Sequence, residues 1–197
     1  MPASHPENHV RREQLPPLAA EDHRCDVCAL AYPEIGIRDA VSAIVGLPGA
    51  VREVVGTIPP EAHRVRPAPQ VWSVAEYLCH IRDVYVSFTI RLHRTRTEDR
   101  PALEPMFNDL RARRFRYNAC DLETTLDELA AAAAGFCEEI ARTGEHDWSR
   151  VATRLPGEHR TARWLVRQAM HEGIHHLGDI RRIGETLSGA ATDRRSA

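Results

Sequence analysis

Four segments of the chain repeat apolar residues every three or four positions, the spacing that gathers them on one face of an α-helix. These segments span residues 35–58, 74–96, 122–142 and 162–185. Strands would alternate apolar and polar residues, and the chain has little of that pattern. The sequence therefore predicts an all-α fold, and four amphipathic helices of this length favour a four-helix bundle.

Residues that start helices precede three of the four segments. Ser73 followed by Glu76 matches a capping box, in which both side chains accept hydrogen bonds from backbone N–H groups of the first turn. Asp121 and Thr161 stand where the N-caps of the third and fourth helices are expected. These residues indicate where the predicted helices begin.

The connections bear on the topology. In the first segment, the run Gly46-Leu47-Pro48-Gly49 predicts a kink or a break, because proline lacks the N–H and clashes with the preceding turn. The connection from about residue 97 to 120 is long, and residues 105–117 within it could form a short extra helix. A crossover of this length suggests that the bundle is not a plain up-down-up-down chain.

Both ends of the chain are polar. Residues 1–22 contain four prolines, and we expect them and residues 188–197 to be disordered tails around one domain, 23–187. The N-terminus has no apolar signal core, and no apolar run approaches the roughly 20 residues of a membrane span. Five cysteines, an odd number, argue against a secreted disulfide framework. These features favour a cytoplasmic protein that does not enter a membrane.

The basic residues narrow the possible chemistry, because all 26 are arginine and the chain has no lysine. Schiff-base catalysis and the phosphate-binding lysine of a P-loop are therefore excluded. Arginine stays protonated, so proton transfer falls to the 11 histidines, the carboxylates, the thiols or a bound metal. The net charge of -2 gives no indication of nucleic-acid binding.

Histidines provide the strongest local signal. In the run HEGIHH, His171 and His175 are four residues apart and so share a helix face, from which both can reach one metal ion. Glu172 and His176 are also four apart, about 100° further around the helix, and spacing alone does not choose between the two pairs. His80, in the second segment, is the best candidate for a third ligand. Three such ligands with an open position are typical of a catalytic divalent-metal site.

Two motifs resemble those of the DinB-like superfamily. The segment VWSVAEYLCHIRDVY, residues 71–85, is similar to the family's second-helix motif, and HEGIHHLGDI, residues 171–180, resembles its last motif. The resemblance covers about residues 35–187. It implies an up-down-down-up four-helix bundle with a long crossover between the second and third helices. It also implies that the metal ligands are His80, His171 and His175.

The same resemblance suggests an activity. Zinc is the usual metal of the family, and iron, nickel and manganese occur in relatives. Members include thiol S-transferases that use bacillithiol, mycothiol or glutathione, and a mycothiol-dependent isomerase. We therefore expect an enzyme that activates a small thiol, such as mycothiol, for attack on an electrophile, and that forms a homodimer. The alternatives are a non-catalytic metal-binding stress protein, isomerase chemistry, and iron–thiol oxygenase chemistry.

Several other charged residues are candidates for supporting roles. Asp83 and Asp179 could orient ligand histidines, although Asp179 stands where the family more often has glutamine and could instead be a fourth ligand. Arg111, Arg113 and Arg114 could hold an anionic cosubstrate, because the guanidinium fork suits carboxylates. The alternative for these arginines is a solvated basic face.

A CxxC motif, Cys25 to Cys28, precedes the first helix. Such a pair can hold zinc, cycle between thiol and disulfide, or consist of free thiols. It lies outside the part of the chain that resembles the family, and the sequence leaves its role open.

Overall fold

A computed structural model describes residues 16–195 of the chain. Four long helices dominate it: α1 (Ile37–Thr57), α2 (Val74–Thr97), α4 (Leu122–Ala141) and α5 (Ala162–Arg195). The shorter elements are α3 (Asn108–Arg114), the 3₁₀ turns η1 (Tyr32–Glu34), η2 (Pro60–Ala62), η3 (Tyr117–Ala119) and η4 (Glu145–Ser149), and the strands β1 (Val151–Thr153) and β2 (His159–Thr161). The predicted all-α four-helix bundle is confirmed, and the sheet is a single antiparallel pair of strands.

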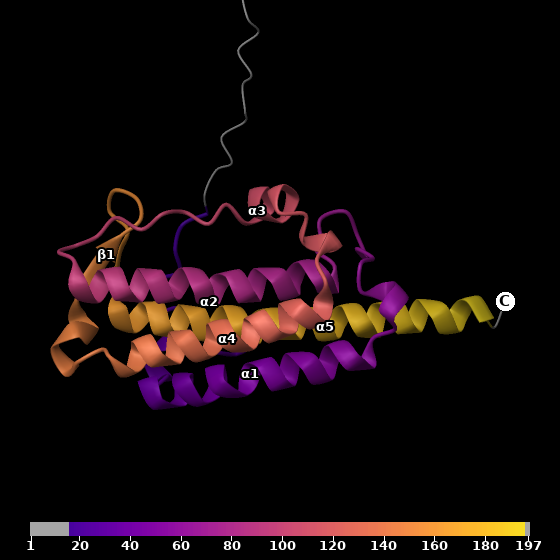
Figure 1. Cartoon of the computed structure of the whole chain (residues 1–197), viewed down its shortest axis with the longest axis horizontal. Helices are drawn as coiled ribbons and strands as arrows, with labels where there is room; N and C mark the ends of the chain where they lie inside the picture. The colour runs from indigo at the N-terminus through magenta and orange to yellow at the C-terminus, as the bar shows by residue number, and fades with distance from the viewer. Residues whose placement is uncertain (1–15, 196–197) are drawn as a thin grey trace, which may run out of the picture.

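The four long helices form a closed ring of neighbours. Both α1 and α2 pack against α4 and against α5. The crossover after α2 returns along the length of the bundle, so α2 and α4 run in the same direction, while α1 and α5 run in the opposite one (Figure 1). This is the expected up-down-down-up arrangement, and the short helix α3 lies within the crossover.

The predicted helix starts are confirmed by their capping contacts. Ser73 and Glu76 form the complete capping box at the start of α2. Asp121 accepts a hydrogen bond from the backbone N–H of Thr124, at 2.8 Å. The Thr161 hydroxyl accepts one from the backbone N–H of Trp164, at 3.1 Å. Each cap satisfies a donor that the helix itself leaves free, which explains why the helices begin at these residues.

Helix α1 continues through Pro48, so the predicted break is absent. Its residues Leu47 and Val51 are buried in the core on either side of the proline. Burial of such side chains offsets the lost backbone hydrogen bond. By length and composition alone, α1 could cross a membrane, but here it packs against α4 and α5 in the bundle.

The structure extends the folded part of the chain beyond residues 23–187. Leu18 donates its backbone N–H to Glu158, and the backbone carbonyls of Leu18 and Ala19 accept hydrogen bonds from Arg160. Residues 16–22, expected in the N-terminal tail, therefore contact the β1–β2 hairpin. Helix α5 continues to Arg195, into the expected C-terminal tail. The rest of both predicted tails, residues 1–15 and 196–197, lies outside the described residues.

A close contact between helices occurs at Gly173 of α5. A Cβ atom there would lie 2.5 Å from Leu47 of α1 and 2.5 Å from the hydroxyl oxygen of Tyr85 on α2. Only a residue without a side chain fits this position, so Gly173 fixes where α5 meets its two neighbours.

Candidate metal centres

Helix α5 carries two pairs of metal-ligating side chains on adjacent faces. His171 and His175 form one pair, and Glu172 and His176 form the other, each with the spacing of one helical turn. The ligand atoms of His80 lie with Glu172 and His176, and those of His171 and His175 lie with Cys25 and Cys28. In the described residues, the three expected histidines do not form one group. The expected set of His80, His171 and His175 is thus divided between two candidate sites, and a third group, His175, His176 and Asp179, shares one histidine with each of them.

The first site contains His80, Glu172 and His176. The Oε2 atom of Glu172 lies 3.4 Å from Nε2 of His80 and 3.2 Å from Nε2 of His176. Ligand atoms bound about 2.1 Å from a tetrahedral metal stand about 3.4 Å apart. Two imidazoles and one carboxylate of α2 and α5 therefore converge at the separation that a divalent metal requires.

Hydrogen bonds hold two of these three ligands in place. Gln168 donates to Oε1 of Glu172 at 2.5 Å, which leaves Oε2 directed at the histidines. Asp179 accepts from Nδ1 of His176 at 2.7 Å, so that Nε2 faces the site. The expectation that Asp179 orients a histidine agrees with this contact, although the histidine it holds is His176. Such contacts fix tautomer and orientation at metal sites.

The electrostatics of the first site suit a cation. Burial alone would lower the pKa of His176, but its hydrogen bonds to Asp179 and Glu172 and their charges outweigh burial and raise the pKa to about 9. Burial lowers the pKa of His80, which favours the neutral imidazole that binds metals. For Glu172, burial is outweighed by the two histidines, which hold its pKa well below the ordinary value.

A pocket of about 390 Å³ opens beside the first site, between α2, α5, the start of α3 and residues 16–19. His80 and Glu172 form part of its wall. Its apolar lining comes from side chains that include Val84, Phe88 and Met106. The first site is therefore accessible to a small molecule, which is the main structural difference between a catalytic and a purely structural metal site.

Arginines line this pocket, but they are not the ones that the sequence suggested. Arg91 and Arg154 belong to the lining, whereas Arg111, Arg113 and Arg114 do not. Arg111 binds Asp83, with its Nη2 atom 2.5 Å from Oδ2, and Arg113 and Arg114 are exposed.

Asp83 faces α3 and η3 rather than the ligands. Its Oδ2 atom accepts hydrogen bonds from Arg111 and Tyr117, and Oδ1 accepts one from Arg82 at 2.9 Å. Burial would raise the pKa of Asp83, but these partners outweigh it and lower the pKa. Among the described residues, Asp83 makes no hydrogen bond to a metal-ligating side chain, so its expected role in orienting a metal ligand is not supported. Asp83 instead attaches α3 to α2 at the side of the pocket.

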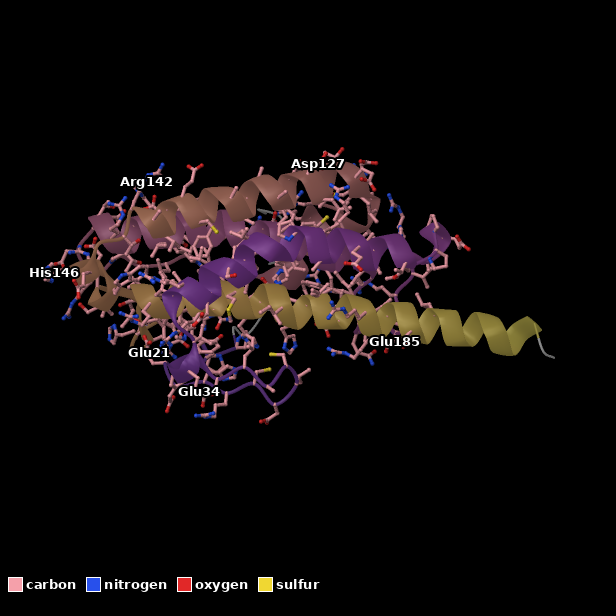
Figure 2. All side chains as sticks on the ribbon, turned by 90° about the horizontal axis from the view of Figure 1, so that it is seen from below. Glu21, Glu34, Asp127, Arg142, His146 and Glu185 are labelled. Atoms are coloured by element: carbon pink, nitrogen blue, oxygen red, sulfur yellow. The ribbon has the colours of Figure 1, made fainter. Side chains whose placement is uncertain are left out.

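The second site joins α5 to the segment that precedes α1. The CxxC residues Cys25 and Cys28 come from that segment, which lies along the flank of α5 and also carries Glu21 and Glu34 (Figure 2). Burial alone would raise the pKa of Cys25, but hydrogen bonds from the backbone and side chain of Cys28 and from the backbone of Val27 outweigh it and lower the pKa. Burial lowers the pKa of His171 to about 4, which leaves its imidazole neutral at ordinary pH.

The sequence offered Glu172 and His176 as an alternative ligand pair, and the family resemblance favoured His171 and His175, although the sequence held a signal for the pair that meets His80. Successive residues of an α-helix are about 100° apart, so Glu172 and His176 lie about 60–100° from Gly173, whereas His171 and His175 lie about 160° from it. Because Gly173 lies directly against side chains of α1 and α2, the pair nearer to it faces the bundle. A helix contact at Gly173 therefore predicts that Glu172 and His176, the pair nearer to it, meet His80.

Comparisons with known proteins agree with this fold. The structure of YfiT from Bacillus subtilis, described as a probable metal-dependent hydrolase with an unusual four-helix bundle topology, matches with a TM-score of 0.70 at 15% identity. That match covers 77% of this chain and 87% of YfiT. A mutant of the mycothiol-dependent maleylpyruvate isomerase matches with a TM-score of 0.61 at 10% identity, over 75% of this chain.

Because the sequence identities of these two matches are low, the matches support the fold alone. The chain spans 62% of the length of the isomerase. No curated protein sequence matches the chain. The sequence profile of the DinB superfamily matches residues 43–180, which include α2, the crossover and both ligand pairs of α5. From this match and the up-down-down-up bundle, the chain is a member of the DinB superfamily.

Proposed function

We propose that this protein is a metal-dependent enzyme that joins a small thiol to an electrophilic substrate. The observation that carries the proposal is the convergence of His80, Glu172 and His176, of which His80 and Glu172 form part of the wall of a pocket. Three protein ligands leave a coordination position free for a substrate, as in catalytic zinc sites. A divalent cation at these ligands would lower the pKa of a bound thiol or water and so supply a nucleophile at neutral pH.

The residues around the ligands have separate tasks. Gln168 holds the Glu172 carboxylate, and Asp179 holds His176, so both ligands keep their orientation without a substrate. The Trp72 ring lies 5.2 Å from that of His80, edge to face, and covers it on one side. Such packing excludes water from the ligand and strengthens its electrostatic interactions.

Arg91 gives the pocket its substrate preference. Its guanidinium donates to the backbone carbonyl of Glu104 at 2.6 Å, and no carboxylate of the described residues lies within ion-pair distance of it. Burial and the nearby Arg154 charge lower the pKa of Arg91 to about 10, so an anion would stabilise its charged form. The pocket therefore suits a substrate or thiol that carries a carboxylate, with an apolar part against Val84 and Phe88.

A thiol substrate is favoured because the fold is similar to that of a mycothiol-dependent isomerase. Hydrolysis is the second candidate reaction, because the fold is also similar to that of YfiT. Mycothiol, bacillithiol and glutathione all carry a thiol and a polar or anionic portion, which suits a metal and an arginine on one pocket. In the hydrolytic alternative, the same ligands would hold water in place of the thiol.

The test is turnover with defined substrates. The protein, loaded with zinc, nickel, iron or manganese in turn, is mixed with each of the three thiols and an electrophilic aryl halide, and the thioether is measured. We expect turnover with at least one thiol, loss of turnover in Glu172→Ala, and normal turnover in His146→Ala, whose exposed imidazole lies on η4. Replacing Arg91 with leucine should raise the KM for an anionic thiol about tenfold or more, the cost of a lost charge-assisted hydrogen bond.

Two outcomes would contradict the proposal. Thioether formation that is equal in the wild type and Glu172→Ala would place the reaction outside this site. Absence of thioether with every thiol and metal, together with metal-dependent ester hydrolysis that Glu172→Ala abolishes, would replace the transferase with the hydrolase.

A further inference from the structure

We propose that Cys25, Cys28, His171 and His175 bind a zinc ion in a closed, four-ligand site that fastens the segment before α1 to α5. The ligand atoms of these residues all lie within 4.8 Å of one another. This site shares no ligand with the pocket site and does not depend on the proposed reaction. The two cysteines also lie outside residues 43–180, the part of the chain that matches the superfamily.

The spacing of the four residues is that of a structural zinc site. Two residues separate Cys25 from Cys28, and three separate His171 from His175. Structural zinc sites typically combine C-x₂₋₄-C with H-x₃₋₅-H. Two thiolates and two imidazoles in a tetrahedral arrangement select zinc over the harder divalent metals.

The cysteines sit on a backbone turn that brings both sulfurs to one side. The backbone N–H of Cys25 donates to the carbonyl of Leu30 at 2.8 Å, and an antiparallel bridge pairs Arg24 with Ala31. Ala29, directly after the second cysteine, has a φ of 57°, in the left-handed region that closes tight turns. The turn is thus formed by the chain itself and holds the CxxC pair ready for a ligand.

The distance between the two halves of the site fits a bound zinc ion. The Sγ atom of Cys25 lies 3.5 Å from Nδ1 of His175. With Zn–S of about 2.3 Å and Zn–N of about 2.1 Å, a tetrahedral ion places sulfur and nitrogen about 3.6 Å apart. The cysteine and the histidine, 150 positions apart in the chain, therefore already stand at the separation of two zinc ligands.

A chain of hydrogen bonds fixes the tautomer of His171. Gln168 donates its amide N–H to Glu172, so the amide oxygen of Gln168 accepts the Tyr32 hydroxyl proton, at 2.6 Å. The Tyr32 oxygen can then only accept from Nδ1 of His171, at 2.9 Å. Nδ1 therefore carries the proton, and Nε2 keeps a free lone pair.

That free lone pair is otherwise unexplained. Nε2 of His171 is buried and has no hydrogen-bond partner within the described part of the chain. An unpaired polar atom of this kind costs roughly 1–3 kcal/mol unless something binds it. A zinc ion held jointly with Cys25 and Cys28 would use this lone pair.

The proposed zinc ion has a structural consequence for the pocket. The segment that it fastens continues from residues 16–19, which form part of the pocket wall. Hydrogen bonds from Arg160 hold Leu18 and Ala19 at the other end of this segment. With four protein ligands, the zinc ion has no position for a substrate, so it stabilises the wall without taking part in the reaction.

Cobalt substitution tests the site directly. The full-length reduced protein is loaded with Co²⁺, and its absorption spectrum is recorded. We expect a near-ultraviolet thiolate-to-cobalt charge-transfer band and intense visible bands of tetrahedral cobalt. Folded wild-type protein that binds cobalt without a charge-transfer band would overturn the proposal, because Cys25 and Cys28 would then not be ligands.

Variants assign the band to its residues. Cys28→Ser should lose most of the charge-transfer intensity, whereas Cys137→Ser and the pocket-site variant His80→Ala should keep it. A Cys28→Ser spectrum equal to that of the wild type would overturn the assignment. Because Cys28→Ser could unfold, His171→Ala provides a second test: it keeps both thiols, but cobalt titrated against the charge-transfer band should bind at least tenfold more weakly. Unchanged cobalt affinity in the charge-transfer titration of His171→Ala would also contradict the four-ligand site.

Amide hydrogen exchange tests the fastening role. Removal of zinc by a chelator should abolish protection of the backbone amides of Cys25 and Tyr32, both of which are hydrogen-bonded in the turn. Protection of the α4 amides should remain. Equal protection of the turn with and without zinc would show that the ion does not hold the segment.

Discussion

The two candidate sites of α5 use adjacent residues and differ in what surrounds them. Glu172 and His176 meet His80 of α2 beside a pocket. His171 and His175, one position earlier on the helix, meet the CxxC turn instead. A rotation of about 100° around one helix thus separates a three-ligand site with access for a substrate from a four-ligand site without it. The partner elements, more than the histidines, determine the kind of chemistry that each site supports.

Removal of one ligand from each site should separate their roles most strongly. His176→Ala is expected to lower turnover by at least about 100-fold, more than loss of an orienting partner would, while the folded state persists. Cys28→Ser is expected to lower the free energy of unfolding by more than about 4 kcal/mol, as loss of a structural metal does. Chemical denaturation and turnover assays on the two variants measure both quantities. If both variants lost stability equally, the distinction between the sites would not hold.

Gly173, between the two ligand pairs, tests the packing that positions both sites. Gly173→Ala should lower the free energy of unfolding by about 1–3 kcal/mol, because its Cβ would overlap Leu47 and the Tyr85 hydroxyl. The matched control is Gly178→Ala, whose Cβ would lie 3.4 Å from the end of the flexible Arg182 side chain. That control should be neutral or stabilising by up to about 1 kcal/mol through helix propensity. Urea denaturation compares the two, and equal effects would contradict the close contact at Gly173.

Tyr32 tests the hydrogen-bond chain that joins the two sites through Gln168. Tyr32→Phe removes the acceptor of the His171 Nδ1 proton and should weaken zinc binding at the cysteine site about 10–100-fold. Tyr85→Phe is the control, because the buried Tyr85 hydroxyl has no partner within the described residues. Competition with a colorimetric zinc chelator gives both affinities. Unchanged zinc affinity in Tyr32→Phe would show that the hydroxyl does not support His171.

The smallest expected effect concerns the start of α2, the helix that carries His80. Burial would raise the pKa of Glu76, but hydrogen bonds from Arg66 and Ser73 outweigh it and lower the pKa. The ionised Glu76 carboxylate therefore raises the free energy of unfolding fully at pH values above its unfolded pKa of about 4.5. This contribution is lost as the pH falls through the lower pKa of the folded state. Glu76→Gln should reduce the acid-induced loss of stability by about 1 kcal/mol. The exposed Glu61→Gln should not, and denaturation at several pH values below 6 compares them.

The helices were predictable from sequence because their signals are local. The apolar spacing and the caps at Ser73, Asp121 and Thr161 are properties of a few neighbouring residues, and the structure bears them out. Of the kink or break expected at Pro48, the break is absent for a non-local reason, since burial of the flanking side chains outweighs one lost hydrogen bond.

The composition of the sites was less predictable, because it depends on which helix faces meet. The sequence identified the i, i+4 pairs of α5, and the spacing did not choose between them. Arg111 was expected to hold a cosubstrate, but in the structure its guanidinium binds the Asp83 carboxylate, a contact that the sequence did not indicate. The contact between the CxxC turn and α5 joins residues 150 positions apart, and no local pattern indicates it.

A crystal structure of the zinc-loaded protein, with anomalous diffraction recorded at the zinc edge, tests the central claim most directly. We expect two peaks, one among Cys25, Cys28, His171 and His175, and one among His80, Glu172 and His176. A single peak shared by His80, His171 and His175 would contradict the division of the α5 ligands into two sites.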